Sequence, residues 1–533
     1  MKINNKNLVF SIIFLMILCL PLGGFTTIIG RAPENTLDGR LHISESMLWP
    51  INGTVINNAL NDQQGSQIVS DGAGGAIITW YDNRPGSISY DIYAQKIDAT
   101  GMIQWNSNGV VICNATSSQL SPQITSDGSG GAIIIWEDSR TSAITGADIY
   151  AQRINSDGNI LWTANGTLIC NATNRQHSYK LIGDGFGGAI IAWQDGRLSS
   201  EWDIYAQKIN STGTVQWTAN GTVICNATHY QTALEIISDG AGGAIITWDD
   251  GRNFGITGYD IYAQKIDSSG TVKWTTNGTV ICNATADQKS ASIISAGAGG
   301  AIITWDDNRY SGSTEADIYA QKIDSSGVGQ WTSNGTVICN AADQQKFPSI
   351  VSNGAGGAII TWTDKRTASN YDIYTQEINS AGMVQWTANG TTICNALGDQ
   401  LTFQTISDNS GGAIITWDDN RPGSISYDIY AQKIDSTGIL QWTPNGIVIC
   451  NALGEQSGSR LVSDGTGGAI ITWDDNRNSG TTSWDVYAQK IDDHPSGGGQ
   501  IPGFDLVVIF VISAISVISA ILMHYRKKKL MRG

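Results

Sequence analysis

A repeated Asp-x-Arg triplet and a second aspartate, in Asp-Ile-Tyr, recur in every unit of this sequence. Arginine forms parallel hydrogen bonds to carboxylates and sulfates, so a ring of such arginines could hold carboxylated sugars or sulfate. The alternative is an Arg–Asp pair that closes each hairpin, and we predict this role because a feature present in every unit usually belongs to the fold. Examples of the triplet are Asp82/Arg84, Asp195/Arg197, Asp364/Arg366 and Asp475/Arg477. The second aspartates are Asp91, Asp148, Asp203, Asp260, Asp317, Asp372, Asp428 and Asp485.

Other catalytic or metal-binding patterns are weaker. The repeated Asp-Gly-x-Gly-Gly turn could suggest calcium, but Ala296 and Asn353 replace its aspartate in two units. Only His177 and His229 lie in the repeats, which is too few for a catalytic triad or a histidine metal site. Paired carboxylates for glycoside hydrolysis stay open, because acids occur throughout the chain. We expect neither a metal nor a cofactor.

Seven cysteines occupy one position of the repeat. Equivalent positions on neighbouring units should lie beyond the ~7 Å Cα limit for a disulfide. We predict free, buried thiols that act as small hydrophobic side chains. They are Cys113, Cys170, Cys225, Cys282, Cys339, Cys394 and Cys450.

The elements that carry these residues are eight units of about 56 residues. Trp80, Trp136 and their equivalents end a Gly-Gly-Ala-Ile-Ile-Thr-Trp-like run at spacings of 55 to 57. Runs rich in Ile, Val, Thr, Tyr and Trp, bounded by Gly, Asp and Asn, predict four strands a unit. We designate these strands a to d in sequence order, with d running from the second tryptophan to the cysteine. The pattern predicts an all-β, eight-bladed β-propeller of four-stranded repeats.

The two ends of the repeat array predict a closed ring. The array opens with a lone d strand that contains Trp49, and it ends after a c strand at Ile491. The last unit therefore lacks the strand that the first segment offers. Pairing the two would complete the eighth blade and remove a bare sheet edge.

The turn between strands c and d supplies a family resemblance. Ala263, Asp267, Gly270 and Trp274 form A-x-x-x-D-x-x-G-x-x-x-W, which resembles the tryptophan-docking motif of quinoprotein dehydrogenases and related eight-bladed propellers. The resemblance implies that each tryptophan stacks on a glycine of the neighbouring blade. Quinoproteins typically carry adjacent cysteines near their cofactor, and this chain has none.

Both ends of the chain predict export and anchoring. Lys2 and Lys6 precede an apolar run, as in a secretory signal peptide, although an uncleaved N-terminal anchor is the alternative. Twenty residues before Arg526 carry no acid or base except His524, and a basic cluster follows, which predicts one transmembrane helix with the propeller outside the cell. The predicted segments are a signal peptide (1–28), a lead-in (29–46), the propeller (47–492), a Gly-rich linker (493–503), the helix (504–525) and a cytoplasmic tail (526–533).

The segment before this helix also resembles a known sorting signal. Pro502, Gly503 and Phe504 precede the apolar span and its basic tip, as in the C-terminal sorting tails of archaeal surface proteins. The resemblance implies a surface protein held in the cell membrane by its C-terminal helix.

The loops between strands b and c hold every length change in the array, and the loops between d and a keep their length but vary in content. Both sets should emerge on one face, where variable loops on a rigid scaffold commonly bind ligands. Neutral drift after amplification is the alternative explanation. The candidate anchors of this ligand face are Trp202, Tyr259, Tyr310, Tyr371 and Trp484.

Sequons for N-glycosylation are frequent around the d strands, which should form the outer rim. They are Asn52, Asn114, Asn165, Asn171, Asn210, Asn220, Asn226, Asn277, Asn283, Asn334 and Asn389.

Composition limits the possible partners. Charged residues make up 15% of the chain and the net charge is −16, which argues against a nucleic-acid partner. We expect a cell-surface binding, adhesion or envelope scaffold module without catalysis, with an extracellular protein or glycan ligand. The alternatives are an extracellular enzyme, quinoprotein-like or glycan-cleaving, with its site at the central channel, and an envelope element that binds nothing.

Overall fold

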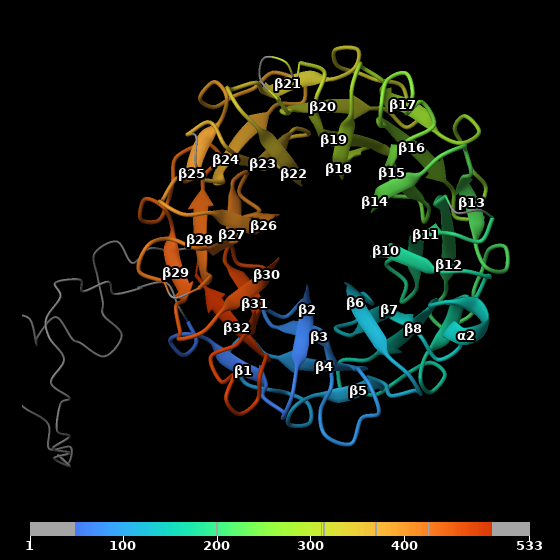
Figure 1. The fold of residues 1–533 in the computed structure, drawn as a ribbon, viewed down its shortest axis with the longest axis vertical. Helices are drawn as coiled ribbons and strands as arrows, with labels where there is room; N and C mark the ends of the chain where they lie inside the picture. Colours follow the sequence, from blue (N-terminus) through green and yellow to red (C-terminus); the bar gives the residue numbers. More distant parts are fainter. Residues whose placement is uncertain are drawn as a thin grey trace, which may run out of the picture. The chain divides into compact units, whose positions relative to one another are not determined.

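The computed structural model describes residues 48–198, 201–310, 312, 315–367, 370–424 and 426–492. They form eight antiparallel four-stranded sheets arranged radially around an axis (Figure 1), so the predicted all-β, eight-bladed propeller is confirmed. The predicted signal peptide, lead-in, linker, transmembrane helix (504–525) and tail lie outside the described residues. Within the described part, no helix has the length and apolar character needed to cross a bilayer.

Blades are numbered 1 to 8 from β2, and each runs from an inner strand a to an outer strand d. The a strands are β2 (Gln63–Ser70), β6 (Gln119–Ser126), β10 (Gln176–Gly183), β14 (Gln231–Ser238), β18 (Gln288–Gly297), β22 (Gln345–Ser352), β26 (Gln400–Ser407) and β30 (Gln456–Ser463). The b strands are β3 (Ala76–Asp82), β7 (Ala132–Asp138), β11 (Ala189–Asp195), β15 (Ala244–Asp250), β19 (Gly300–Asp307), β23 (Ala358–Asp364), β27 (Ala413–Asp419) and β31 (Ala469–Asp475).

The c strands are β4 (Asp91–Ile97), β8 (Asp148–Ile154), β12 (Asp203–Ile209), β16 (Asp260–Ile266), β20 (Asp317–Ile323), β24 (Asp372–Ile378), β28 (Asp428–Ile434) and β32 (Asp485–Ile491). The d strands are β5 (Val110–Cys113), β9 (Thr167–Cys170), β13 (Thr222–Cys225), β17 (Thr279–Cys282), β21 (Thr336–Cys339), β25 (Thr391–Cys394), β29 (Ile447–Cys450) and, for blade 8, β1 (Thr54–Asn57). One short helix, α2 (Ser142–Thr145), lies in the b–c loop of blade 2.

The hydrophobic core lies between neighbouring blades. Ile190 and Ile204 of blade 3, for example, pack in one cluster with Ile246 and Trp248 of blade 4. Strand b is buried on both faces, which explains its continuous apolar run, and its tryptophans are fully buried. Each blade is therefore stabilised by the blade on either side.

The first strand of the array closes the ring, as predicted. β1 pairs antiparallel with β32, with Thr54 opposite Ala488 and Val55 opposite Tyr487. Trp49 packs in the cluster between blades 8 and 1. The chain thus fastens its first blade to its last, and the edge of β32 is paired.

In each blade, strands a and d differ in length from the prediction. Strand d covers only the four residues that end at each cysteine position, because a turn with Asn277 at φ 62° and Gly278 at φ 94° interrupts the extended chain in blade 4. A Cβ at Gly278 would lie 2.6 Å from the Trp248 ring, so this turn requires glycine. Strand a is longer than predicted, since it begins at a glutamine that the sequence analysis placed in the d–a loop.

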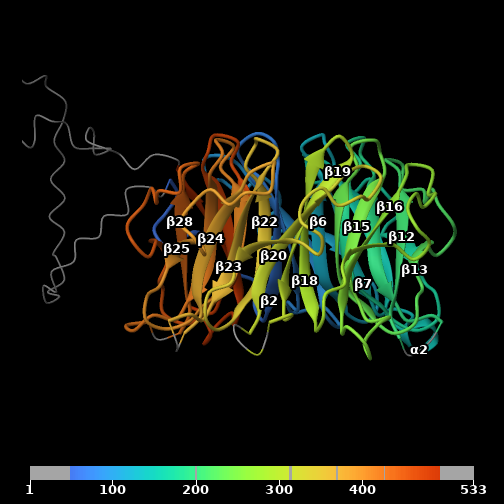
Figure 2. The ribbon, with the colours of Figure 1, turned by 90° about the horizontal axis from the view of Figure 1, so that it is seen from above.

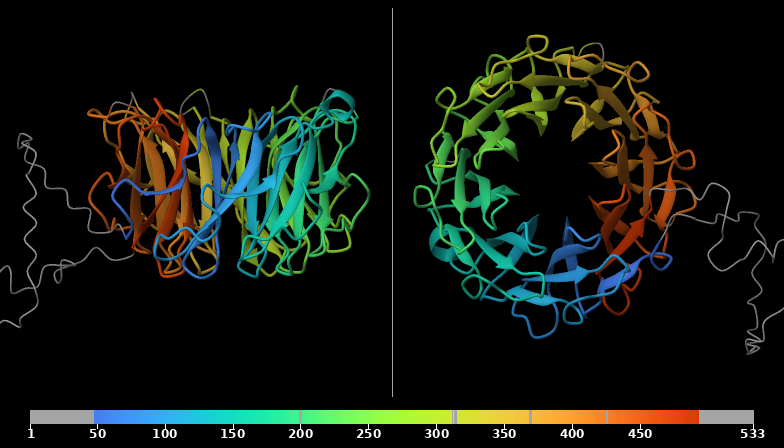
Figure 3. Two further views of the ribbon diagram at one scale, coloured as in Figure 1. Left: turned by 90° about the horizontal axis from the view of Figure 1, so that it is seen from below. Right: turned by 180° about the vertical axis from the view of Figure 1, so that it is seen from behind.

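The strands run between two faces of the ring (Figures 2 and 3). Antiparallel connection places the b–c loops, including α2, with the d–a loops on one face, here the variable face. The a–b and c–d turns lie on the opposite face, here the constant face. The inner strands surround the axis, as Figure 1 shows for β2, β6 and β10.

Candidate functional site

The Asp-x-Arg arginines are occupied by the fold. In blade 4 the Asp250 carboxylate accepts hydrogen bonds from Arg252 Nε (2.8 Å) and Nη2 (2.6 Å) and from Trp248 Nε1 (2.6 Å). The Arg252 guanidinium stacks on the Tyr262 ring, 3.8 Å from its centroid. The pairing prediction is confirmed, and the arginine ring presents no free guanidinium fork to a ligand. The same ion pair joins Arg84 to Asp82, Arg140 to Asp138, Arg197 to Asp195, Arg309 to Asp307, Arg366 to Asp364, Arg421 to Asp419 and Arg477 to Asp475.

The cysteines pack against this cluster from the preceding blade. All seven described cysteines are free and buried, as predicted. Arg252 Nη2 lies 3.3 Å from Cys225 Sγ, and burial raises the pKa of the Cys225 thiol to about 12, so it is neutral and unreactive at ordinary pH. In the closing strand Asn57 takes this position and donates to Asp82 Oδ2 (2.9 Å).

The aspartates of Asp-Ile-Tyr hold the b–c loops. Asp91 accepts from Ser87 (2.6 Å) and Asp260 from Asn253 (2.9 Å), while burial raises the pKa of both carboxyls. They stabilise the loops that follow the arginines.

The Asp-Gly-x-Gly-Gly turns are held by their own backbone. Asp239 Oδ1 accepts from Ala241 N and Gly243 N at 2.8 Å each, and Lys265 Nζ lies 3.6 Å from Oδ2. In blade 6 a neutral asparagine replaces the aspartate and a glutamate replaces the lysine, and Asn353 Nδ2 donates to Glu377 Oε1 (2.7 Å). Across the described residues, His, Cys, Asp and Glu side chains form no group of three or more suited to a metal.

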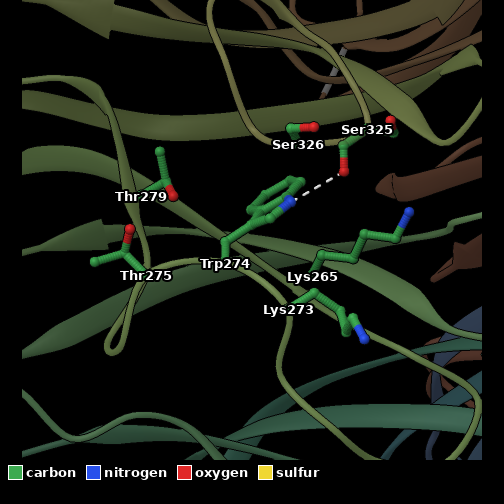
Figure 4. Close-up of a pocket in the computed structure, with 7 residues that line it drawn as sticks. All are labelled: Lys265, Lys273, Trp274, Thr275, Thr279, Ser325 and Ser326. Carbon is green, nitrogen blue, oxygen red and sulfur yellow. Dashed lines mark hydrogen bonds between the residues drawn. The ribbon is translucent and has the colours of Figure 1, made fainter.

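The c–d turn of blade 4 lines a hollow of about 460 Å³ on the constant face (Figure 4). Trp274 donates from Nε1 to the Ser325 carbonyl of the next blade (3.1 Å), and its ring covers Gly327. Lys265 and Lys273 complete the hollow. Because the Trp–Gly contact recurs around the ring, this feature is structural. The other contacts are Trp49–Gly101, Trp105–Gly158, Trp162–Gly213, Trp217–Gly270, Trp331–Gly382 and Trp386–Gly438.

The five predicted anchor residues do not form one site. Trp202 packs edge-on against His177, with centroids 4.1 Å apart, and Lys289 Nζ lies 4.5 Å above the Tyr259 ring. Tyr310 is exposed on its loop. Tyr371 lines a cavity in the channel, and Trp484 lines a smaller one between blades 8 and 1. Their role in binding stays a prediction.

All the sequons except Asn210 fall into two structural classes. Asn114 is exposed, whereas Asn165 is half-buried at φ 61° and accepts the Asn114 N–H through its Oδ1 (3.0 Å). The same contact joins Asn171 to Asn220, Asn226 to Asn277 and Asn283 to Asn334. Asn52 and Asn389 are likewise half-buried at positive φ, and Asn210 caps a c–d turn. Glycosylation stays a prediction.

A wide cavity, here the main cavity, lies at the mouth of the central channel, on the variable face. It has a volume of about 990 Å³ and is lined mainly by the inner strands of blades 2 to 7. Its lining includes Tyr179, Phe347 and Phe403. Lys180 and Glu235, on adjacent blades, are its only charged lining residues, and they form an ion pair of 2.6 Å. The cavity is thus wide and without net charge, and both polar and apolar side chains line it.

A β-bulge in each inner strand shapes this mouth. The register shifts after the second residue of every inner strand, and the third residue has positive φ. An extra residue at a bulge redirects the neighbouring side chains. The positive-φ residues are Gly65, Ser121, Ser178, Ala233, Ser290, Phe347, Thr402 and Gly458.

Buried carboxylates of the preceding blade hold some of these bulges. Asp249 accepts the backbone N–H groups of Ser290 (2.9 Å) and Ala291 (3.4 Å). Burial, with the nearby Asp306 carboxyl, raises the pKa of Asp249 to about 8, against an ordinary value of 3.8. Asp474 holds the Gly65 bulge in the same way (2.7 Å), and Asp418 holds that of Gly458 (2.9 Å).

We expect the raised pKa of Asp249 to appear as a pH-dependent stability. Between about pH 4 and pH 8 the folded state keeps a proton that the unfolded state has released, so stability falls as pH rises. The slope is at most about 1.4 kcal/mol per pH unit, and it ends above the folded pKa. Asp249→Asn should remove this contribution, measured as the difference between the urea unfolding free energies of the two proteins from pH 4 to 9. A difference that is constant with pH would contradict the assignment.

Asp267→Asn is the matched control. Hydrogen bonds from Ser269 and Thr271 lower the pKa of this turn carboxyl to about 2. The ionised Asp267 therefore stabilises the folded state above about pH 4, and this stabilisation is lost as the pH falls below that value. The pH dependence is thus opposite to that of Asp249.

Comparisons with known proteins give no family. No family model and no curated protein matches the chain. Among solved structures, a polysaccharide lyase of family 25, an ulvan lyase, has a TM-score of 0.41 at 10% identity, covering 84% of this chain and 96% of the lyase. An α-L-arabinanase of Penicillium chrysogenum has a TM-score of 0.32 at 10% identity (59% and 93% covered). A Dyadobacter fermentans protein of unknown function has 0.34 at 9% (61% and 97% covered). Likenesses this distant carry no argument about activity.

The sequence analysis placed its candidate anchors mainly on the b–c loops of the variable face, and their role in binding stays a prediction. It gave most weight to the b–c loops, whereas the channel mouth is built from residues counted with the d–a loops, such as Ser178 and Ala233. One signal in the sequence could have identified these segments as strands. Their residues vary while their length stays constant, as expected of positions in a strand. The sequence and the structure together establish the fold, an eight-bladed β-propeller.

Proposed function

We propose that this protein is a cell-surface binding module whose ligand enters the mouth of the central channel from the variable face. The observation that carries the proposal is a comparison of two blades of the same chain. Residues 82–98 of blade 1 and 419–435 of blade 7 are identical, including their b–c loops. Their inner strands nevertheless differ in chemistry, with Gly65 and Ser66 in one and Thr402 and Phe403 in the other.

Neutral drift does not explain this pattern well. Exposed loops should diverge before a strand that packs against its neighbours, yet here the loop is unchanged and the strand has changed. The c–d segments also differ, but mostly between side chains of similar size and polarity, such as Ile103 and Leu440. Diversification at the channel mouth is what ligand recognition would produce.

The position of the last propeller strand supports an orientation in which the variable face points away from the membrane. β32 ends at Ile491, and the c–d turns that follow the other c strands lie on the constant face. A chain that continues from there into a membrane helix at 504–525 would direct the constant face toward the membrane. The variable face and the channel mouth would then point away from the cell.

The test is capture from envelope extract by the full-length protein in a zwitterionic detergent. One variant carries the blade 1 residues Gln-Gly-Ser in place of residues 401–403 of blade 7. A second carries Gly-Ser repeats in place of the loop residues 422–427, which keeps the Arg421–Asp419 pair. We expect the first to lose capture and the second to retain it. Loss only with the loop variant would favour the b–c loops, and no capture by the unaltered protein would contradict a binding function.

A glycan-cleaving enzyme is the second candidate. Asp249 and Asp306 both contact Ser290 at the cavity wall, and burial raises their pKa values to about 8 and about 6. Carboxyls with separated pKa values are typical of acid–base pairs. Against this role, Asp249 is almost fully buried and its oxygens hold backbone N–H groups. Release of reducing ends from the captured material, abolished in Asp306→Asn, would favour the enzyme.

A further inference from the structure

Phe347 is the residue of the channel mouth that the fold least explains. It occupies the positive-φ position of its bulge at φ 54°, where the other seven blades have Gly, Ser, Ala or Thr. A bulky residue in this region is strained, by about 1–3 kcal/mol. Its side chain is also 58% exposed, so little burial compensates for the strain. Strain that the fold does not require is typical of functional positions.

On the side of the main cavity, Phe347 is surrounded by mostly uncharged groups, whereas the adjoining hollow that it also lines contains Asp287, Lys289, Asp306 and Lys346. Phe347 lines the main cavity with hydroxyl and amide side chains, among them Gln123, Ser349 and Gln404. The side chains of these three residues make no hydrogen bond within the part of the chain that the structure describes. They are therefore available to donate to, and accept from, the hydroxyl groups of a ligand.

The charges of the cavity are balanced within it. Lys180 Nζ and Glu235 Oε1 lie 2.6 Å apart, and this pair leaves no unpaired charge in the lining. A sulfated or carboxylated ligand would need an unpaired cation here, and the blade arginines are already paired with aspartates.

The shape of the inner strands disfavours a peptide. An extended peptide binds a sheet by pairing along a free strand edge. Each inner strand is bulged at its third residue, which interrupts the edge that such a peptide would need. The cavity of about 990 Å³ is at the upper end of the range for small-molecule sites, large enough for several sugar rings.

We propose that the channel mouth binds an uncharged carbohydrate chain, with one sugar ring stacked on the exposed face of Phe347. The apolar C–H face of a sugar suits an aromatic face, and the surrounding amides and hydroxyls suit its hydroxyl groups. This inference rests on the proposed function and names the ligand class of the same site.

The experiment uses the full-length protein in a zwitterionic detergent on an array of neutral, carboxylated and sulfated oligosaccharides of three or more rings. We expect binding to neutral chains, weakened roughly tenfold or more in Phe347→Gly. Gly is the residue of blades 1 and 8 at this position, so the variant should keep or raise the thermal midpoint. A lower midpoint would itself contradict the strain at Phe347.

Phe186→Ala is the matched control, because Phe186 is also exposed (83%) but lies in an a–b turn on the constant face. It should bind as the unaltered protein does. Binding only to charged chains, equal binding by Phe347→Gly, or no binding on the array would overturn the inference. If envelope extract is still captured while the array is negative, the binding function stands and the carbohydrate class fails. If both are negative, both fail.

Discussion

Asp250→Ala is expected to destabilise the propeller by about 3–5 kcal/mol, the cost of leaving one partner of a buried ion pair uncompensated. Asp250 is fully buried, and its two oxygens accept from the Trp248 indole, the Arg252 backbone N–H (2.9 Å) and two guanidinium nitrogens. Removing the carboxylate leaves a largely buried guanidinium without its anion and a buried indole N–H without its acceptor. The measurement is equilibrium unfolding in urea at pH 7.

Two further variants define the origin of this effect. Lys273→Ala breaks an exposed ion pair with Asp267 and should cost at most about 1 kcal/mol. The double variant Asp250→Ala/Arg252→Ala should be less unstable than the sum of its single changes, because it removes both charges together. A loss below about 1 kcal/mol in Asp250→Ala would show that the Trp–Asp–Arg cluster does not stabilise the blade interface.

The fold could be predicted from the sequence because each unit repeats its strand and turn signals. The eight tryptophan-ending runs gave the second strand of each blade, and the unmatched segments around Trp49 and Ile491 gave the ring closure. The pairing of Arg252 with Asp250 followed from its presence in every blade. These features depend on neighbouring residues or on a repeated spacing, and both can be recognised in the sequence alone.

The channel mouth could not be predicted in the same way. Its residues are adjacent only because eight inner strands surround one axis, so Tyr179 and Phe347 share a cavity across 168 positions of sequence. The bulge is also hidden, since no glycine marks it in six blades and Ser, Ala, Thr or Phe adopts positive φ there. A carboxylate of the preceding blade, such as Asp249, holds several of these bulges, and that contact is visible only between blades.

The closing strand adds a constraint that a single blade does not show. In the other seven blades the d strand is covalently continuous with its blade, whereas β1 reaches blade 8 from the opposite end of the chain. Its Trp49 and Ile56 contribute to the core between blades 8 and 1. We therefore expect the stability of the whole ring to depend on this one short strand at its start.

Deleting residues 47–57 is expected to open the ring and abolish the monomeric fold. The deletion removes the partner of β32 and the buried Trp49 and Ile56 side chains, each worth about 2–5 kcal/mol in a core. It also exposes the edge of β32, and an unpaired edge promotes association with other chains. Size-exclusion chromatography with light scattering should show oligomers or aggregates, and amide exchange in β31 and β32 should become fast.

A peptide of residues 47–58 added in trans should restore part of the protection of β32, because it supplies the missing strand by pairing along that edge. Asn57→Cys is the control for the strand itself, since cysteine occupies this position in the other seven blades, and we expect it to remain monomeric and folded. A stable monomer after the deletion, with slow exchange in β32, would mean that the inter-blade cores alone hold the ring closed. If the peptide instead converts oligomers to monomers, closure of the ring depends on the β1–β32 pair, where the two ends of the array meet without a covalent link.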